Sequence, residues 1–241
     1  MGVTINCDIG ESYGLYSFGN DVKIMPHIDI ANVACGFHAS DPSVMHKTVK
    51  MAMEHGVSIG AHPSLPDRQG FGRREMEMER NELRDLLIYQ VGALKGFLDA
   101  EGVALNHIKP HGALFGMTSK YEHCAEAAAD VSEIFGVPLI GQVGTMHDTV
   151  YTRRGLLWWP EFYADLEYDE GCRLIITREH VAYEPEAAAA RALRALTEGV
   201  VTSVSGNDMP IRFETVCIHS DTPGIETVAP TLRDALAPYI D

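Results

Sequence analysis

The chain has 241 residues, 46% of them hydrophobic, and a formal net charge of −15 at pH 7. This length suits one large domain or two small ones, and the apolar content is ample for a buried core. The acidic charge disfavours nucleic acid and anionic membranes as partners, although it leaves room for a small anionic substrate.

The five cysteines are widely spaced and form no C-x-x-C pair. The first residues do not combine a basic region with a long apolar run, so no signal peptide is visible. No apolar stretch approaches the roughly 20 residues that span a bilayer. We therefore expect a cytoplasmic protein with reduced thiols.

Short apolar runs that are typical of buried strands alternate with helical segments along the chain. Asp41 followed by Pro42 predicts a helix start, and Gly102 and Gly199 predict helix ends. In chain order, we expect strands at residues 3–7, 28–34, 57–61, 107–109, 137–140, 156–159 and 215–218, and helices at about 42–55, 78–100, 119–135, 145–153, 185–198 and 225–237.

This alternation predicts an α/β fold in which helices cover a parallel sheet. No linker or clear repeat divides the chain, so we expect a single domain over residues 1–241. Open sheets gather ligands where the strand order reverses, whereas polar clusters here follow six of the seven predicted strands. A seven-stranded parallel β/α barrel, closed or nearly closed, accounts best for that spread.

Polar residues accompany the first two predicted strands. Asp8 and Glu11 are spaced to serve as acid and base, or as metal ligand and base, and either alone is also compatible with a helix cap. Asn6 lies in the strand itself, so we expect it to face the barrel interior or the site. Asn32 and His38 accompany the second strand and are candidates for contacting a substrate.

The third predicted strand is followed by His62 and by a loop at residues 64–74 that is rich in proline, glycine and charge. Arg73 and Arg74 end this loop. Arginine binds carboxylates through two parallel hydrogen bonds, so both are candidates for binding a substrate carboxylate. The alternative for each arginine is a surface ion pair with a neighbouring glutamate.

Lys109 and His111 follow the fourth predicted strand. A lysine at a strand end before a proline is hard to explain by packing. Near other cations its pKa would fall and it would act as an acid–base catalyst, whereas a retained cation would stabilise an oxyanion. His111 is a candidate for sharing that work or binding a metal.

Four polar residues complete the set, namely Glu161, Asp165, His219 and Asp221. We expect His219 and Asp221 to form a couple in which the carboxylate fixes the imidazole tautomer, with a helix cap as the alternative for Asp221. For the remaining histidines we expect structural or solvated roles: His27, His46, His55, His107, His123, His147 and His180.

Taken together, these motifs resemble one family. The matching stretches are N-C-D-I-G-E (6–11), A-N-V-A-C-G-F-H-A-S-D-P (31–42), I-G-A-H-P (59–63), P-D-R-Q-G-F-G-R-R (66–74), K-P-H-G-A-L (109–114) and C-I-H-S-D-T-P (217–223). In this order and combination they resemble the LamB/YcsF family, whose bacterial members are called the A-type subunit of 5-oxoprolinase. The resemblance spans nearly the whole chain.

The resemblance implies a seven-stranded β/α barrel related to sugar and amide deacetylases. It implies ATP-dependent cleavage of the lactam 5-oxo-L-proline to L-glutamate, in a complex with B- and C-type subunits that would handle ATP. The expected catalytic residues are Asp8, Glu11, Lys109, His111 and Asp221. The expected substrate-binding residues are Asn6, Asn32, His38, His62, Arg73, Arg74, Glu161 and His219.

Two positions depart from the family pattern. Leu166 stands where the family usually has an arginine after the aspartate, and Ser220 stands where it has a glycine. Leu166 removes a fixed cation and Ser220 adds bulk. Both changes bear on which small amide is the substrate and on the use of partners.

Two alternative functions remain open. One is a metal-dependent deacetylase or amidohydrolase that needs no ATP, in which Asp8, His38 and His62 would hold a divalent ion and activate water. The other is a non-catalytic subunit that binds a metabolite and regulates a partner. Replacement of Lys109 by alanine distinguishes the non-catalytic subunit from an enzyme, because unchanged turnover by the complex would favour binding over catalysis.

Overall fold

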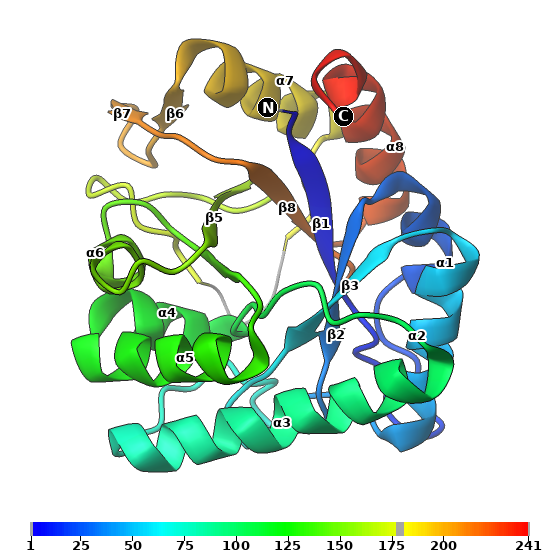
Figure 1. The fold of residues 1–241 in the computed structure, drawn as a ribbon. Coiled ribbons are helices and arrows are strands. Elements are labelled where there is room, and N and C mark those ends of the chain that lie inside the picture. Colours follow the sequence, from blue (N-terminus) through cyan, green and yellow to red (C-terminus); the bar gives the residue numbers. More distant parts are fainter. Residues whose placement is uncertain (1, 177–180, 241) are drawn as a thin grey trace.

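The computed structural model describes residues 2–176 and 181–240. Six parallel strands form one curled sheet at its centre, in the order β3-β2-β1-β8-β5-β4 (Figure 1). Their bounds are Thr4–Ile9 for β1, Ile30–Ala34 for β2, Ser58–His62 for β3, Leu139–Gly141 for β4, Trp158–Tyr163 for β5 and Thr215–His219 for β8.

The predicted seven strands are not confirmed. The segment at residues 107–109 forms only isolated parallel bridges, through Ile108, to Ala61 of β3 and Leu139 of β4. Pro110 follows at once and has no N–H to extend the pairing. The two edge strands of the sheet are thus linked through one short segment, which takes the place of the expected fourth strand.

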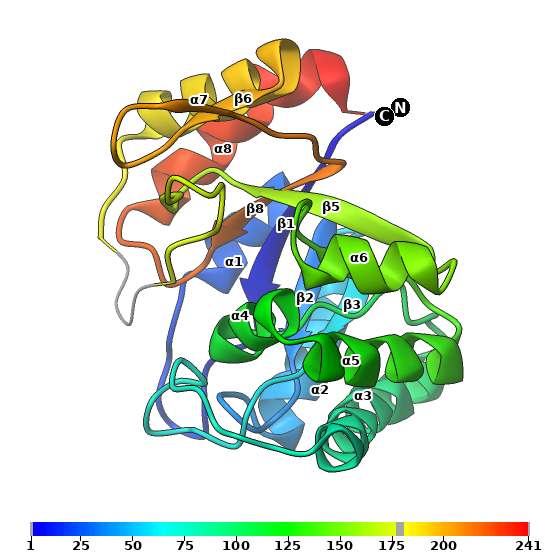
Figure 2. The same ribbon diagram turned by 90° about the vertical axis from the view of Figure 1, so that its left-hand side faces the viewer.

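Helices surround the curled sheet in both views (Figures 1 and 2). Their bounds are Asp21–Ile24 for α1, Pro42–Glu54 for α2, Arg80–Glu101 for α3, Gly112–Lys120 for α4, Glu122–Phe135 for α5, Met146–Arg153 for α6, Pro185–Glu198 for α7 and Ile225–Leu236 for α8. Two 3-10 turns, Met25–His27 and Ala237–Tyr239, and a hairpin of β6 (Val200–Thr202) and β7 (Asp208–Pro210) complete the described elements.

Local chemistry sets several helix ends where the sequence predicted them. The Asp41 carboxylate accepts hydrogen bonds from the N–H groups of Ser43 and Val44, so it caps α2 as expected. Gly102 and Gly199 end α3 and α7 in the left-handed conformation that favours glycine. Each cap satisfies backbone groups that a helix end would otherwise leave without a partner.

Two predicted elements differ from the structure. The helix expected at 119–135 begins only at Glu122, as α5, because Tyr121 adopts an extended conformation. Residues 119 and 120 end a separate helix, α4, which was not predicted. The strand expected at 156–159 begins at Trp158 and runs to Tyr163. Glu161 therefore lies inside β5 rather than after it, and its carboxylate is buried in the sheet.

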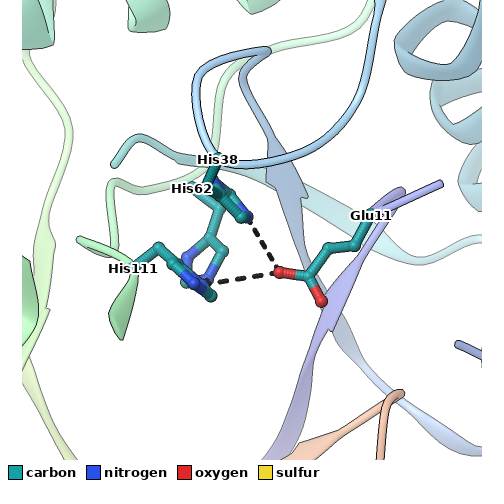
Figure 3. Close-up of side chains that lie close together, drawn as sticks. All are labelled: Glu11, His38, His62 and His111. Atoms are coloured by element: carbon teal, nitrogen blue, oxygen red, sulfur yellow. Dashed lines mark hydrogen bonds and ion pairs between the residues drawn. The ribbon is translucent and has the colours of Figure 1, made fainter. Parts of the chain in front are cut away.

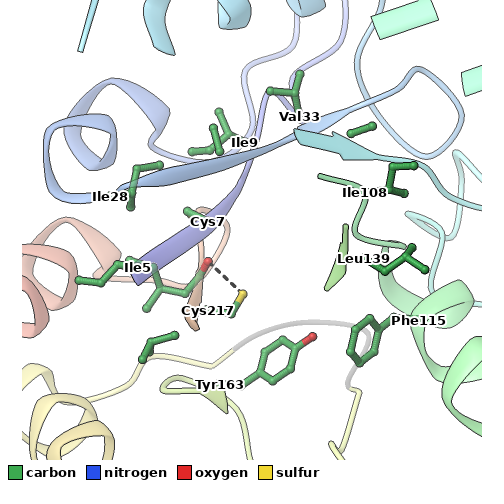
Figure 4. Close-up of a cluster of buried hydrophobic side chains, with 14 of the residues drawn as sticks. Ile5, Cys7, Ile9, Ile28, Val33, Ile108, Phe115, Leu139, Tyr163 and Cys217 are labelled. Atoms are coloured by element: carbon green, nitrogen blue, oxygen red, sulfur yellow. Dashed lines mark hydrogen bonds between the residues drawn. The ribbon is translucent and has the colours of Figure 1, made fainter. Parts of the chain in front are cut away.

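Side chains alternate between the two faces of the strands. In β1, Ile5, Cys7 and Ile9 belong to the continuous hydrophobic core, and Figure 4 shows these side chains among their neighbours. The residues between them, Asn6 and Asp8, are polar and buried. The sheet therefore has a polar inner face, and this face positions the candidate site. No described helix has the length and apolar character that crossing a membrane requires.

A buried histidine connects α6 to α4. His147 Nδ1 accepts the N–H of Gln142 at 3.0 Å, and its Nε2–H donates to Thr118 Oγ1 at 2.8 Å. Burial lowers the pKa of His147 to about 3. The ring is therefore neutral in the folded protein at any pH above that value.

This burial predicts an acid-sensitive stability. Below the unfolded pKa of about 6.5 the unfolded chain binds a proton at residue 147 that the folded chain does not, so stability falls as pH falls toward 3. Between pH 7 and 5 this histidine contributes a loss of about 2 kcal/mol. His147→Gln should reduce the pH dependence of unfolding by that amount in urea titrations.

The control is His55→Gln, the same substitution at an exposed histidine. It should leave the wild-type pH dependence in place. An unchanged pH dependence in His147→Gln would contradict the assignment.

Candidate active site

The polar inner face of the sheet is held together by side-chain hydrogen bonds between strands. Asn32 of β2 donates from Nδ2 to Asn6 Oδ1 and to Asp8 Oδ1, each at 2.8 Å. His107 Nε2 lies 2.6 Å from Asn32 Oδ1 and donates to it. Three residues predicted for the site are thus fixed by a fourth that was expected to be structural.

The His107 ring occupies the space that a side chain at position 60 would fill, and Gly60 leaves that space free. A Cβ added at Gly60 would lie 2.1 Å from Cε1 of the His107 ring, well inside any allowed contact. Burial lowers the pKa of His107 to about 3, so the ring is neutral. The glycine of the I-G-A-H-P motif is therefore required by close packing rather than by a turn.

Lys109 is buried among oxygen and sulfur atoms. Its Nζ lies 2.8 Å from Glu161 Oε1, 3.2 Å from Asp8 Oδ1 and 3.2 Å from Asn6 Oδ1, and 3.0 Å from Cys217 Sγ. Burial alone would lower the pKa of Lys109, but Asp8 and the other anionic groups raise it well above its usual value. Of the two roles left open by the sequence, the geometry supports the retained cation.

Glu11 and three histidines lie close together (Figure 3). His38 Nε2 lies 2.9 Å from Glu11 Oε1, and His111 Nδ1 lies 3.4 Å from the same oxygen. His62 Nε2 lies 2.9 Å from His111 Nδ1 and 3.1 Å from Asp8 Oδ2. All five side chains are buried.

The electrostatics of these groups follow from burial and from their neighbours. Burial, followed by the carboxylates of Asp221 and Asp8, raises the pKa of Glu11 well above its usual value. Burial also lowers the pKa of His38 and of His111 well below the ordinary imidazole value. For Asp8, burial acts in the opposite direction, yet His62 and Lys109 lower its pKa well below the usual range.

His219 is paired with Asp165, not with Asp221 as predicted. Its Nδ1 lies 3.0 Å from Asp165 Oδ1, and its backbone N–H donates to Asp165 Oδ2 at 3.0 Å. Thr222 donates a further hydrogen bond to Asp165 at 2.8 Å. The reason is sheet order, because β5 lies next to β8 and places residue 165 beside residue 219. Asp165 raises the pKa of His219 although burial acts to lower it.

Asp221 instead contacts the glycine-rich loop. Its Oδ2 lies 3.0 Å from Arg73 Nη2, and both side chains are buried. Arg74 lies outside this site, because its side chain is half exposed and its Nε donates to Asp67 at 2.9 Å. Of the two arginines predicted to bind substrate, the structure brings only Arg73 to the other candidate residues.

The loop at residues 64–74 packs on the histidines. The Phe71 carbonyl oxygen lies 2.8 Å from His111 Nε2. Gly72 has φ of +64°, and a Cβ there would lie 2.2 Å from Ser64 Oγ and 2.8 Å from His111 Cδ2. Only glycine fits both the conformation and the space, so this residue allows the loop to close over His111.

A small cavity of about 30 Å³ joins these groups, which is space for one or two water molecules. Its polar lining includes Lys109 and His219. Its apolar lining, which includes Phe115, Leu174 and Ile176, was not predicted, since these residues carry no chemical signal in the sequence. The lining residues are Asp8, His62, Arg73, Lys109, Pro110, His111, Gly112, Phe115, Tyr163, Leu166, Leu174, Ile176 and His219.

Two groups of described residues offer atoms suited to a metal ion. Ligand atoms within 4.8 Å of one another come from Glu11, His38, His62 and His111 in one group, and from Asp8, Cys217 and His219 in the other. Imidazole and carboxylate donors of the first group are those that Zn²⁺ and similar ions bind. The predicted set of Asp8, His38 and His62 is thus divided between neighbouring groups.

The sequence pattern of the LamB/YcsF family matches residues 3–239. The chain belongs to the LamB/YcsF family. Among its relatives, lactam utilization protein lamB of Emericella nidulans is 43% identical over 234 residues, which cover 95% of this chain and 92% of the relative. The A-type subunit of 5-oxoprolinase from Bacillus licheniformis is 45% identical over 223 residues, which cover 91% and 88%.

A solved structure agrees with the fold of this LamB/YcsF chain. The crystal structure of lactam utilization protein from Thermus thermophilus has a TM-score of 0.91 and 39% identity, and the match covers 99% of this chain and 97% of that chain. The family resemblance inferred from the motifs is therefore confirmed. The two departures lie in or beside this site, since Leu166 lines the cavity and Ser220 is buried next to His219.

Within the LamB/YcsF chain, the predicted residues other than Arg74 lie in or beside one connected site. Asp165 is the main candidate that is missing from the expected catalytic and substrate-binding residues, although it was among the polar residues that the sequence singled out. His180, expected to be structural or solvated, lies outside the described residues.

The ion contacts of Lys109 generate a stability prediction. Lys109→Met removes the cation and leaves Asp8 and Glu161 buried together, which should lower the free energy of unfolding by about 3–5 kcal/mol. Adding Glu161→Gln removes one of the two carboxylates and should recover part of this loss. Urea unfolding of the single and double variants measures both effects.

Lys95→Met is the control, because Lys95 forms an exposed pair with Asp99 on α3. It should change stability by no more than about 0.5 kcal/mol. Strictly additive losses in the Lys109→Met, Glu161→Gln double variant would argue against the pairing.

Proposed function

We propose that this chain belongs to an ATP-dependent amidohydrolase that opens 5-oxo-L-proline to L-glutamate, as one of its subunits. The observation that carries the proposal is the buried ammonium of Lys109 at the floor of a cavity lined by imidazole and carboxylate groups. The names of the relatives, which refer to lactam utilization and to 5-oxoprolinase, support a lactam as the substrate.

The chemistry requires a group that stabilises negative charge on the lactam oxygen. Water adds to the carbonyl carbon, the carbon–nitrogen bond breaks, and the leaving nitrogen takes up a proton. A fixed cation in a dry site stabilises the oxyanion of such a step strongly. Lys109 is suited to this role rather than to proton transfer, because its pKa is raised and it stays charged.

His219 is suited to move the proton. Asp165 accepts the Nδ1–H, which leaves Nε2 on the side of Asp8, at 3.6 Å from its Oδ2. From there the ring can take a proton from the attacking water and deliver one to the leaving nitrogen. Asp165 thus orients the ring and stabilises its charged form.

Other residues that line the cavity suit the rest of the substrate. Arg73 is a candidate for the carboxylate of 5-oxoproline, and the apolar side chains of Phe115, Leu166 and Leu174 are candidates for its ring methylenes. The present cavity is smaller than a lactam ring, so binding requires these side chains to move apart. Leu166 would then contribute to the choice among small amides.

Partner subunits of B and C type would supply the energy. A five-membered lactam is a stable amide, so its opening benefits from coupling to ATP hydrolysis. The sequence has neither G-x-G-x-x-G nor G-x-x-x-x-G-K-[ST], which supports ATP binding by the partners. Exposed apolar side chains directly after Glu11, namely Tyr13, Leu15 and Tyr16, support a contact with another subunit near the site.

Two further inferences concern the chain as a whole. The hydrophobic side chains form one continuous core, which supports a single domain over residues 1–241. All five cysteines are free thiols, which fits the reducing cytoplasm.

A second candidate function is a metal-dependent amidohydrolase that needs no ATP. The group of Glu11, His38, His62 and His111 favours it, because it gathers carboxylate and imidazole atoms of the kind that bind a divalent ion. Turnover without nucleotide would support this candidate over the first.

The decisive experiment uses the purified chain with its B- and C-type subunits. We expect glutamate release from 5-oxoproline that depends on ATP, and we expect Lys109→Ala to abolish it. Lys95→Ala, the same change on the exposed face of α3, should keep full activity. No glutamate from the complete complex would refute the substrate, and unchanged turnover by Lys109→Ala would support a non-catalytic binding role.

The Asp165–His219 couple gives a second kinetic prediction. Asp165→Asn removes the charge that orients and stabilises the imidazole, so kcat should fall by about 10²-fold or more, with a smaller change in KM. Asp99→Asn on the surface of α3 should leave both constants unchanged. A loss confined to KM would contradict the role of Asp165 in proton transfer.

A further inference from the structure

Hydrogen bonds to backbone carbonyls fix the tautomers of two histidines. His62 Nδ1 lies 2.8 Å from the carbonyl oxygen of Lys109, and His111 Nε2 lies 2.8 Å from the carbonyl oxygen of Phe71. A carbonyl oxygen only accepts, so both of these ring nitrogens carry hydrogen. In the neutral rings, the other two nitrogens must therefore present lone pairs.

Those two lone pairs face each other. His62 Nε2 and His111 Nδ1 are 2.9 Å apart, which is a hydrogen-bond distance with no hydrogen to share between neutral rings. Either an additional proton lies between the two nitrogens, or one metal ion binds to both of them. Histidines that bind metals usually donate their second N–H to a carbonyl or carboxylate, as both rings do here.

Glu11 supplies a third donor. Its Oε1 lies 3.4 Å from His111 Nδ1. Ligands at the usual zinc distances of about 2.0–2.2 Å in a tetrahedron lie about 3.4 Å from one another, which matches the separation of Glu11 and His111. The two ring nitrogens, which are 2.9 Å apart, would move apart by about 0.5 Å to bind the same ion. The His62 and His111 rings are nearly perpendicular, at 87°, so their in-plane lone pairs can converge on one point.

His38 has a different geometry from the other two histidines. Its ring is stacked on His111, with centroids 3.8 Å apart and only 8° between the planes. Parallel planes do not meet, so in-plane lone pairs of these two rings cannot both point at one ion. His38 Nε2 lies 2.9 Å from Glu11 Oε1 and is placed to orient that carboxylate instead (Figure 3).

We propose that Glu11, His62 and His111 bind one divalent transition-metal ion, with a remaining position open toward the cavity. Two imidazoles and one carboxylate with an open position form the donor set of catalytic zinc sites. His62 and His111 both line the cavity, so a bound ion would face the amide. In this respect the inference rests on the proposed function, although metal binding itself requires neither substrate nor partner.

The test measures binding on the purified full chain after chelator treatment, without substrate, ATP or other subunits. Titration with Zn²⁺ should give one ion per chain, and Co²⁺ should give visible absorption of a four- or five-coordinate site. His62→Gln and His111→Gln should each remove this binding. His38→Gln should keep one ion per chain, with an affinity about 10- to 100-fold lower, as expected for an outer-sphere partner.

Cys217→Ser is the matched control, since it alters the neighbouring group of Asp8, Cys217 and His219. It should leave stoichiometry and affinity unchanged. Loss of binding in this variant but not in His111→Gln would place the ion in the other group and overturn the proposal.

The wild-type chain decides the matter even where a variant does not fold. If it takes up no stoichiometric Zn²⁺ or Co²⁺, a proton lies between the two rings and the proposal is wrong. Because glutamate release is assayed separately with the complete complex, failure of metal binding and failure of the proposed reaction are distinct results.

Discussion

The fold is organised around one buried positive charge. The ammonium of Lys109 contacts two side chains from β1, Asn6 and Asp8, together with one from β5 and one from β8. Without it, Asp8 and Glu161 would be two carboxylates buried in a region of low dielectric, which costs several kcal/mol per charge. The register of these strands and the charge state of the site therefore depend on the same contacts of Lys109.

Hydrogen bonds connect the contacts of Lys109 to further side chains of the site. Asn32 holds Asp8 in place, His107 holds Asn32, and Asp8 and Lys109 both line the cavity. Asp8, Asn32 and His107 each have a hydrogen-bond partner from a different segment of the sheet. A shift of one strand would therefore leave several buried groups unsatisfied. Rigid placement of the reactive groups follows from the same contacts that stabilise the sheet.

Sequence reasoning succeeded where the structure is decided locally. Helix starts and ends were predictable because Asp41 and Gly102 act on neighbouring backbone groups. The replacement of the predicted fourth strand by isolated bridges was not, because pairing through Ile108 depends on two edge strands that are far away in the sequence. The shift of β5, which buries Glu161, depends in the same way on pairing with β8.

The composition of the site was likewise predictable from polar residues at strand ends, since such ends converge in β/α folds, but the pairings of its side chains were not. Whether Lys109 is charged depends on Asp8, which is 101 residues away, and the partner of His219 depends on strand order. A single sequence contains no signal for these contacts, and so it placed Asp221 where Asp165 stands.

The contact of Gly60 with His107 has a consequence for the evolution of this fold. A side chain at position 60 can be accommodated only if the ring at position 107 becomes smaller, and a smaller residue there would release Asn32 and, through it, Asp8. Positions 60 and 107 should therefore vary together among descendants of this chain. A library for altering its substrate range would have to randomise them as a pair, or leave both untouched.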